Sequence, residues 1–149
     1  MAGRAQIETS VEIARPPVEV FDYLADVTKH GEWSPKPFRV EDVSGPVAQG
    51  TTFNSFGWLP NDKDHKSAVV VTTYEPPRLF VLTSTDADGE SVNTFTLTPS
   101  GTGTRVDRLM DIPKPDGFFG VMYAILKPTF IRPAVQKGLG MMKKKLEGG

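Results

Sequence analysis

The feature that most constrains this chain is a succession of short segments in which apolar and polar residues alternate, with only a few residues between them. Such alternation is typical of strands that are buried on one face. Six of these segments follow one another, over residues 38–43, 51–58, 66–74, 79–85, 91–98 and 104–112. Turn-forming residues such as Asp88-Gly89 separate them. Because parallel strands need long crossovers, links this short predict an antiparallel meander.

The residues ahead of the meander predict one more strand and one helix. Residues 7–14 alternate in the same way and end at two prolines, Pro16 and Pro17. Apolar residues then recur at positions 20, 21, 24 and 27, which is a helical spacing. Because proline is tolerated in a first helical turn, we predict a helix over 17–26.

The last third of the chain has the pattern of an amphipathic helix. Val135, Leu139, Met142 and Leu146 recur at intervals of three or four residues. Prolines at positions 128 and 133 argue against one straight helix from residue 118 onward. We therefore predict a short helix or ordered loop, followed by a main helix over 129–146.

The predicted order is strand, helix, six strands, long helix, within a single domain over residues 1–149. A sheet with one apolar face needs helices to cover that face. The prediction is an α+β fold in which a curved antiparallel sheet of about seven strands wraps around the C-terminal helix.

Composition excludes several classes of function. Seventeen Lys and Arg residues against 18 Asp and Glu residues leave a net charge of −1, unlike the basic surface of a nucleic-acid-binding protein. The absence of cysteine excludes disulfides, thiolate nucleophiles and cysteine-ligated zinc. No apolar run is long enough for a transmembrane segment, and no secretion signal is visible. We expect a cytoplasmic monomer or homodimer.

Motifs for cofactor or metal chemistry are absent from the sequence. There is no glycine-rich dinucleotide motif, no phosphate-binding loop and no serine nucleophile elbow. Asp62, Asp64 and His65 are residue types that bind metals, but their spacing matches no known site. We therefore expect neither a metal nor a cofactor.

Several segments together resemble one known family. They keep their order along essentially the whole chain and comprise residues 11–35, 50–51, 73–80, 95–99 and 103–106, followed by a Lys/Leu-rich helix that ends at Leu146-Glu147. This arrangement resembles the polyketide cyclase/dehydrase-like branch of the START-like (SRPBCC, helix-grip) superfamily. The resemblance implies an elongated cavity between the sheet and the C-terminal helix. Members bind lipids, sterols, hormones or polyketides, and some catalyse cyclisation or dehydration.

The predicted C-terminal helix contains two interior glycines, Gly138 and Gly140. Each costs about 1 kcal/mol relative to alanine, so each needs a reason. One reason is room for a ligand beside the adaptable methionine side chains of this helix. The other is close packing of the helix against its neighbours.

Strand alternation and the large side chains near irregular segments nominate the wall of a ligand pocket. Pockets for small molecules are apolar with a few polar groups, although the same residues are also typical of an ordinary core. The predicted ligand-binding residues are Trp33, Asn54, Phe56, Trp58, Phe80, Leu82, Asn93, Phe95, Leu97, Arg108, Met110, Met122, Leu139 and Met142.

Arg108 is the most informative of these candidates. It lies between Val106 and Met110 at a period of two, so its guanidinium is expected to point inward. A buried guanidinium needs a carboxylate or a ligand oxygen. Either Arg108 anchors an acidic or carbonyl-bearing ligand, or it pairs with Asp22 or Asp26, or it turns to solvent at a strand end.

The expected function is binding of a hydrophobic small molecule that is lipid-, sterol- or polyketide-like. The first alternative is an enzyme of the polyketide cyclase/dehydratase type, which needs an acid or base within reach of its substrate. Candidates for that role are Tyr23, His30, His65 and Tyr123, and no spacing commits any pair of them. The second alternative is a protein-interaction module without a ligand.

Overall fold

The computed structural model describes residues 3–57, 63–87, 89–114 and 117–148. The strands are β1 (Arg4–Ile13), β2 (Phe38–Glu41), β3 (Thr52–Gly57), β4 (Lys66–Glu75), β5 (Leu79–Asp86), β6 (Gly89–Ser100) and β7 (Gly103–Pro113). Helix α1 (Pro17–Ala25) and the 3-10 helix η1 (Val27–Trp33) lie between β1 and β2. Helix α2 (Gly117–Leu126), the π-helical turn η2 (Lys127–Ile131) and helix α3 (Arg132–Gly148) follow β7.

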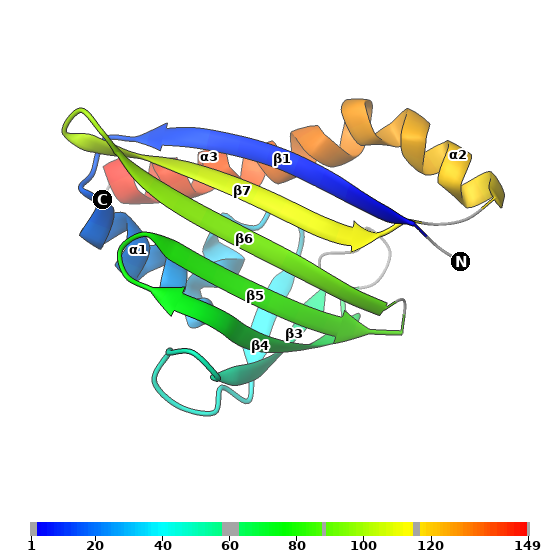
Figure 1. Ribbon diagram of the computed structural model, residues 1–149, viewed down its shortest axis with the longest axis horizontal. Coiled ribbons are helices and arrows are strands. Elements are labelled where there is room, and N and C mark those ends of the chain that lie inside the picture. The colour runs from blue at the N-terminus through cyan, green and yellow to red at the C-terminus, as the bar shows by residue number, and fades with distance from the viewer. Residues whose placement is uncertain (1–2, 58–62, 88, 115–116, 149) are drawn as a thin grey trace.

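The strands form one antiparallel sheet in the order β1-β7-β6-β5-β4-β3-β2. The meander from β2 to β7 is therefore confirmed, and β1 pairs with the last strand of that meander. Figure 1 shows a curved sheet with α3 running behind β1 and β7. We call the sheet face that α1 and α3 cover the inner face, and the opposite one the outer face.

A single apolar core lies between the inner face and the helices. Phe21 and Leu24 of α1 pack there with Leu139 and Met142 of α3, and all four are fully buried. The sheet contributes fully buried side chains from β1, β4, β5, β6 and β7, namely Ile13, Val71, Phe80, Phe95 and Val106. This is the α+β helix-grip architecture that the sequence predicts.

The C-terminal helical region differs in one respect from the prediction. The short first helix is present as α2, but helical structure does not break before the main helix: it continues from Gly117 through the π-helical turn to Gly148. Pro128 lies in that turn, where a proline without an amide hydrogen is accommodated by wider backbone spacing. Figure 1 shows that the helix changes direction there and that α2 extends past the end of the sheet.

Helix α3 also covers the free edge of β1, which is an edge strand. The Gln136 side-chain amide donates to the Ser10 carbonyl at 2.7 Å and accepts from the Ser10 amide at 3.4 Å. Lys143 Nζ donates to the Glu12 carbonyl at 2.7 Å. These side chains pair backbone groups that an exposed edge would leave open to another chain.

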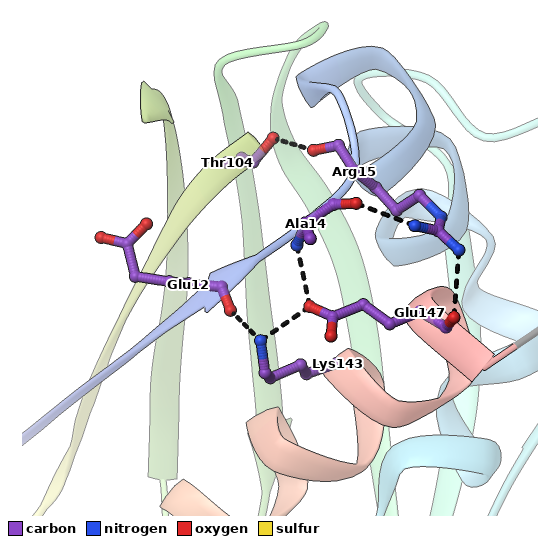
Figure 2. A network of polar contacts seen from close by, with 6 residues as sticks. All are labelled: Glu12, Ala14, Arg15, Thr104, Lys143 and Glu147. Carbon is purple, nitrogen blue, oxygen red and sulfur yellow. Dashed lines mark hydrogen bonds and ion pairs between the residues drawn. The ribbon is translucent and has the colours of Figure 1, made fainter. Parts of the chain in front are cut away.

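A polar network ties the end of α3 to the turn after β1 (Figure 2). The Glu147 carboxylate accepts from the Ala14 amide at 2.8 Å and from Lys143 Nζ at 2.7 Å. These two bonds, the Lys143 bond first, lower the pKa of Glu147. Arg15 donates to the Glu147 carbonyl, and its own carbonyl accepts from the Thr104 hydroxyl.

Close packing explains one of the two interior glycines of α3. A Cβ on Gly138 would lie 3.0 Å from the backbone oxygen of Trp33, so α3 approaches η1 as closely as a glycine allows. A Cβ on Gly140 would meet nothing within 4 Å. The structure therefore favours the packing interpretation at Gly138.

Candidate functional site

One end of the space between the inner face and α3 is filled with side chains. The Trp33 and Phe95 rings lie 5.9 Å apart, and the Phe21 and Phe80 rings 6.1 Å apart, each pair in an edge-to-face arrangement. We call this the filled end. Seven predicted ligand-binding residues are part of this buried core: Trp33, Phe80, Leu82, Phe95, Leu97, Leu139 and Met142.

Burial decreases along β7 toward the other end of the inner face. Val106 is fully buried and Arg108 is 9% exposed, whereas Met110 and Ile112 are only half-buried. Helix α2 comes after β7 in the chain, and several of its apolar side chains are exposed to solvent. Phe118, for example, is 72% exposed. The exposed apolar residues of this helical region are Phe118, Val121, Met122, Ile125 and Phe130. We call the region around Met110 and Ile112 the open end.

Strands β4, β5 and β6 contribute polar side chains to the open end. Ser67 of β4, Ser84 of β5 and Ser91 of β6 are half-buried at inner-face positions. Beside them, His65 Nε2 lies 2.8 Å from Asp86 Oδ2, and each side chain is 22% exposed. A carboxylate that accepts from Nε2 leaves Nδ1 as the basic nitrogen of a neutral imidazole, which is the arrangement a general base needs.

Arg108 lies at the boundary between the filled and the open end. Its Nε donates to Asn93 Oδ1 at 2.9 Å, and its guanidinium lies over the rings of Trp33 and Phe95, at 5.5 and 5.1 Å from their centres. Within the described residues no carboxylate forms an ion pair with it, neither Asp22 nor Asp26. Burial lowers the pKa of Arg108 to about 10, so the guanidinium is charged at neutral pH.

His30 is buried against the Trp33 ring, with the ring centres 4.9 Å apart. Its Nε2 donates to the Leu24 carbonyl at 2.7 Å. Burial lowers the pKa of His30 to about 4, and the positive charge of Arg108 acts in the same direction. His30 is therefore a neutral core residue at physiological pH.

The two tyrosine candidates lie in other surroundings. The Tyr23 hydroxyl donates to Glu32 at 3.0 Å, and burial followed by this bond raises the pKa of Tyr23. Tyr123 lies on α2 and lines a surface pocket of about 460 Å³ with Arg4, Lys114 and Lys127. Burial raises the pKa of Tyr123. None of the contacts among the described residues joins Tyr23, His30, His65 and Tyr123 to one another, so the structure does not assemble them into one site.

Two predicted pocket residues lie on the outer face. Phe53, Ser55 and Gly57 of β3 are buried at inner-face positions, so Asn54 and Phe56 between them point outward. Asn54 donates to Asp42 at 2.9 Å. Phe56 carries the Arg39 guanidinium 4.3 Å above its ring and lines a surface pocket of about 580 Å³. Trp58 lies outside the described residues.

The sequence interpretation missed part of the open end. Asp86 continues the alternation of Phe80, Leu82 and Ser84, so extending the predicted strand by one residue places it on the inner face. Ile112 already lies in the predicted strand over 104–112, where it continues the alternation of Arg108 and Met110, but it was not assigned to the site. Pairing of His65 with Asp86 had no signal in the sequence, because it depends on the register between β4 and β5.

The described part of the chain holds no cluster of metal-ligating side chains and no helix that could span a membrane. Within it, no three His, Asp or Glu side chains are grouped so that they hold a metal ion. No helix among the same residues combines the length and apolar character needed to cross a bilayer.

Known structures share this fold at low sequence identity. TTHA0849 from Thermus thermophilus aligns with a TM-score of 0.76 at 16% identity, over 97% of this chain and 98% of that one. CV1439 from Chromobacterium violaceum gives a TM-score of 0.72 at 17% identity, over 95% and 96% of the two chains. A truncated norcoclaurine synthase from Thalictrum flavum gives 0.70 at 13% identity, over 97% and 94%.

The comparison with family models is more specific than these structural likenesses. No curated protein matches the sequence. A family model described as "Polyketide cyclase / dehydrase and lipid transport" matches residues 4–147, which is nearly the whole chain. With its seven-stranded sheet and long C-terminal helix, the chain belongs to this family of START-like proteins.

Proposed function

We propose that this protein binds a hydrophobic small molecule, lipid-, sterol- or polyketide-like, at the open end of the inner face. The observation that carries the proposal is the uneven cover of that face. Aromatic and aliphatic side chains fill one end, whereas Met110 and Ile112 stay half-buried on the strand that precedes α2 and its exposed apolar side chains. The family description, which names both lipid transport and polyketide cyclisation, supports the same class of ligand.

Burial of apolar surface supplies the driving force for such binding. Removing apolar surface from water contributes about 25 cal/mol per Å², before the cost of ordering the ligand and the protein. A ligand at the open end would cover Met110 and Ile112 of the sheet and apolar side chains of α2 such as Met122. The half-buried serines of β4, β5 and β6 would meet its polar groups.

A filling substitution tests this location. In Met110→Trp a large ring takes the space beside Ile112, and we expect the Kd for the neutral fluorescent lipophile N-phenylnaphthylamine to rise at least tenfold. The matched control is Leu109→Trp, which adds the same ring at the neighbouring position on the outer face and leaves the Kd unchanged. Circular dichroism confirms that both variants fold.

Two results would contradict the proposal. One is equal weakening of binding by both tryptophan variants. The other is a wild-type protein that binds neither N-phenylnaphthylamine nor any member of a panel of fatty acids, sterols and aromatic polyketides.

The second candidate function is acid/base catalysis on a ligand at the same place. The observation that favours it is the His65–Asp86 pair, in which a carboxylate orients an imidazole at the open end. A protein with this fold, the norcoclaurine synthase from Thalictrum flavum, is named as an enzyme.

Turnover of a polyketide mimic decides between binding alone and catalysis. If the pair is catalytic, wild-type protein converts a poly-β-ketone thioester and His65→Gln loses most of that rate. The control Lys66→Gln, at the adjacent exposed position where β4 begins, keeps it. If His65→Gln retains the wild-type rate, or no conversion occurs, the catalytic role is excluded.

A further inference from the structure

Arg108 has bonding capacity that the protein itself does not use. A guanidinium carries five N–H donors, and Arg108 commits one of them, on Nε, to Asn93. Its two terminal nitrogens have no hydrogen-bond partner within the described residues, although the residue is only 9% exposed. The terminal nitrogens form a fork that matches the two oxygens of a planar acceptor.

Two buried donors without partners belong to residues that neighbour Arg108. Thr9 is directly opposite Arg108 in the pairing of β1 with β7, and its hydroxyl is buried without a partner in the described structure. The indole Nε1 of Trp33, whose ring lies against the guanidinium, is also buried without a partner. Leaving such a group buried and unpaired costs about 1–3 kcal/mol, so these two donors, together with the unused terminal nitrogens of Arg108, indicate a missing acceptor.

The charge of this group sets the class of that acceptor. A buried cation without a counter-charge is unfavourable, and an apolar side chain of similar size would be more stable at that place. Thr9 and Trp33 add neutral donors, and the neighbouring His30 is neutral at physiological pH. One positive charge surrounded by neutral donors fits a monoanion better than a doubly charged phosphate.

From this geometry we propose that the ligand carries a carboxylate, which binds the terminal nitrogens of Arg108 with help from Thr9 Oγ1 and Trp33 Nε1. The acidic head group lies at the boundary of the filled end, and the apolar body extends past Met110 and Ile112 to α2. This inference rests on the proposed function, since it assigns a chemical class to the ligand of that same site.

A matched pair of probes tests the proposal. Dodecanoic acid and dodecanol share one alkyl chain and differ in the head group, and their Kd values are measured by displacement of N-phenylnaphthylamine. We expect wild-type protein to bind the acid tenfold to a hundredfold more tightly than the alcohol, the range expected for a charged hydrogen bond.

Three variants test whether Arg108 causes the preference for the acid over the alcohol. Arg108→Met is expected to remove the preference for the acid while the Kd for the alcohol stays within threefold. Asn93→Asp keeps the shape of Asn93 but supplies an internal carboxylate to Arg108. It is therefore also expected to raise the Kd for the acid tenfold or more. Arg105→Met removes an exposed cation from the outer face of the same strand and is expected to leave both Kd values unchanged.

The outcomes separate this inference from the proposed function. If acid and alcohol bind wild-type protein equally well, or if Arg108→Met keeps the preference for the acid, the carboxylate proposal is wrong and lipophile binding stands. If the protein binds N-phenylnaphthylamine but neither the acid nor the alcohol displaces it, the carboxylate proposal is likewise wrong and lipophile binding stands. If wild-type protein binds neither N-phenylnaphthylamine nor any fatty acid, sterol, polyketide or dodecyl probe, both proposals fail together. If Arg105→Met also removes the preference for the acid, that preference comes from surface charge, and the proposed site at Arg108 is wrong.

Discussion

At the scale of single residues, two basic side chains buried beside Trp33 behave in opposite ways. His30 donates one hydrogen bond to a carbonyl and can lose its charge, so burial keeps it neutral, with its pKa lowered to about 4. Arg108 keeps its charge because its pKa, although lowered by burial to about 10, remains far above neutrality. The neutral histidine stabilises the fold, and the charged arginine is available to a ligand.

The lowered pKa of His30 predicts a loss of stability in acid. The unfolded chain takes up a proton near pH 6.5, whereas the folded protein takes it up only near pH 4, so the unfolded state binds more protons between these values. The free energy of unfolding should therefore fall from pH 7 to pH 4, by about 3 kcal/mol from this group alone.

Chemical denaturation of His30→Gln at several pH values checks this prediction. Glutamine keeps a donor for the Leu24 carbonyl but does not titrate, so the variant should lose less stability in acid than wild-type protein. Equal pH dependence of the two proteins would show that His30 is not the group responsible.

A second prediction concerns the energetic cost of Arg108 without a ligand. Replacing the guanidinium and its partner together, in Arg108→Met/Asn93→Leu, removes a buried charge that lacks a counter-ion. Such replacements are often stabilising by 1–4 kcal/mol, and we expect a gain of about 1 kcal/mol here. Urea denaturation of ligand-free protein measures it, and a loss of more than about 2 kcal/mol would mean that Arg108 has a structural role.

At the scale of secondary-structure elements, the sequence predicted all seven strands and the two covering helices, because alternation and helical spacing are local properties of the chain. It did not predict that the helix continues through Pro128, because the π-helical turn depends on backbone geometry that no spacing reveals. The contact of α3 with the edge of β1 was also out of reach. Gln136 and Lys143 are ordinary polar residues in the sequence, and only the fold places them against backbone groups of β1.

The two glycines of α3 provide a matched pair of tests. Gly140→Ala has open space around its new methyl group and should raise the free energy of unfolding by up to about 1 kcal/mol. Gly138→Ala meets the Trp33 backbone oxygen and should lower it. Thermal denaturation gives both values, and equal stabilisation by the two substitutions would refute the close approach of α3 to η1.

The covered edge of β1 predicts a measurable contribution from Gln136. Truncation in Gln136→Ala leaves the amide and carbonyl of Ser10 without this partner and should cost about 1 kcal/mol of stability. The neighbouring exposed residue is the control, so Lys137→Ala should change stability by less than half as much. Urea denaturation compares the two, and equal effects would argue against this role of α3.

At the scale of the whole molecule, the fold was predictable but the site was only partly so. Arg108, Asn93 and Met110 could be assigned to the inner face by counting along their strands. Trp33 and Phe80 could not be distinguished from pocket wall, because core and pocket residues are chemically alike. The division into a filled and an open end follows from how the side chains of all elements pack together, which no local pattern encodes.

The methionines lie where they report directly on the central claim, that a hydrophobic ligand occupies the open end. Met110 lies at that end and Met122 on α2, which the proposed ligand would reach, whereas Met141 and Met142 lie on α3 over the filled end. NMR of protein labelled at the methionine methyl groups, titrated with dodecanoic acid, follows both ends in one sample. We predict that the methyl resonances of Met110 and Met122 shift in a saturable way while that of Met142 stays within its linewidth. Saturable shifts confined to Met141 and Met142, or no shifts at all, would contradict the account.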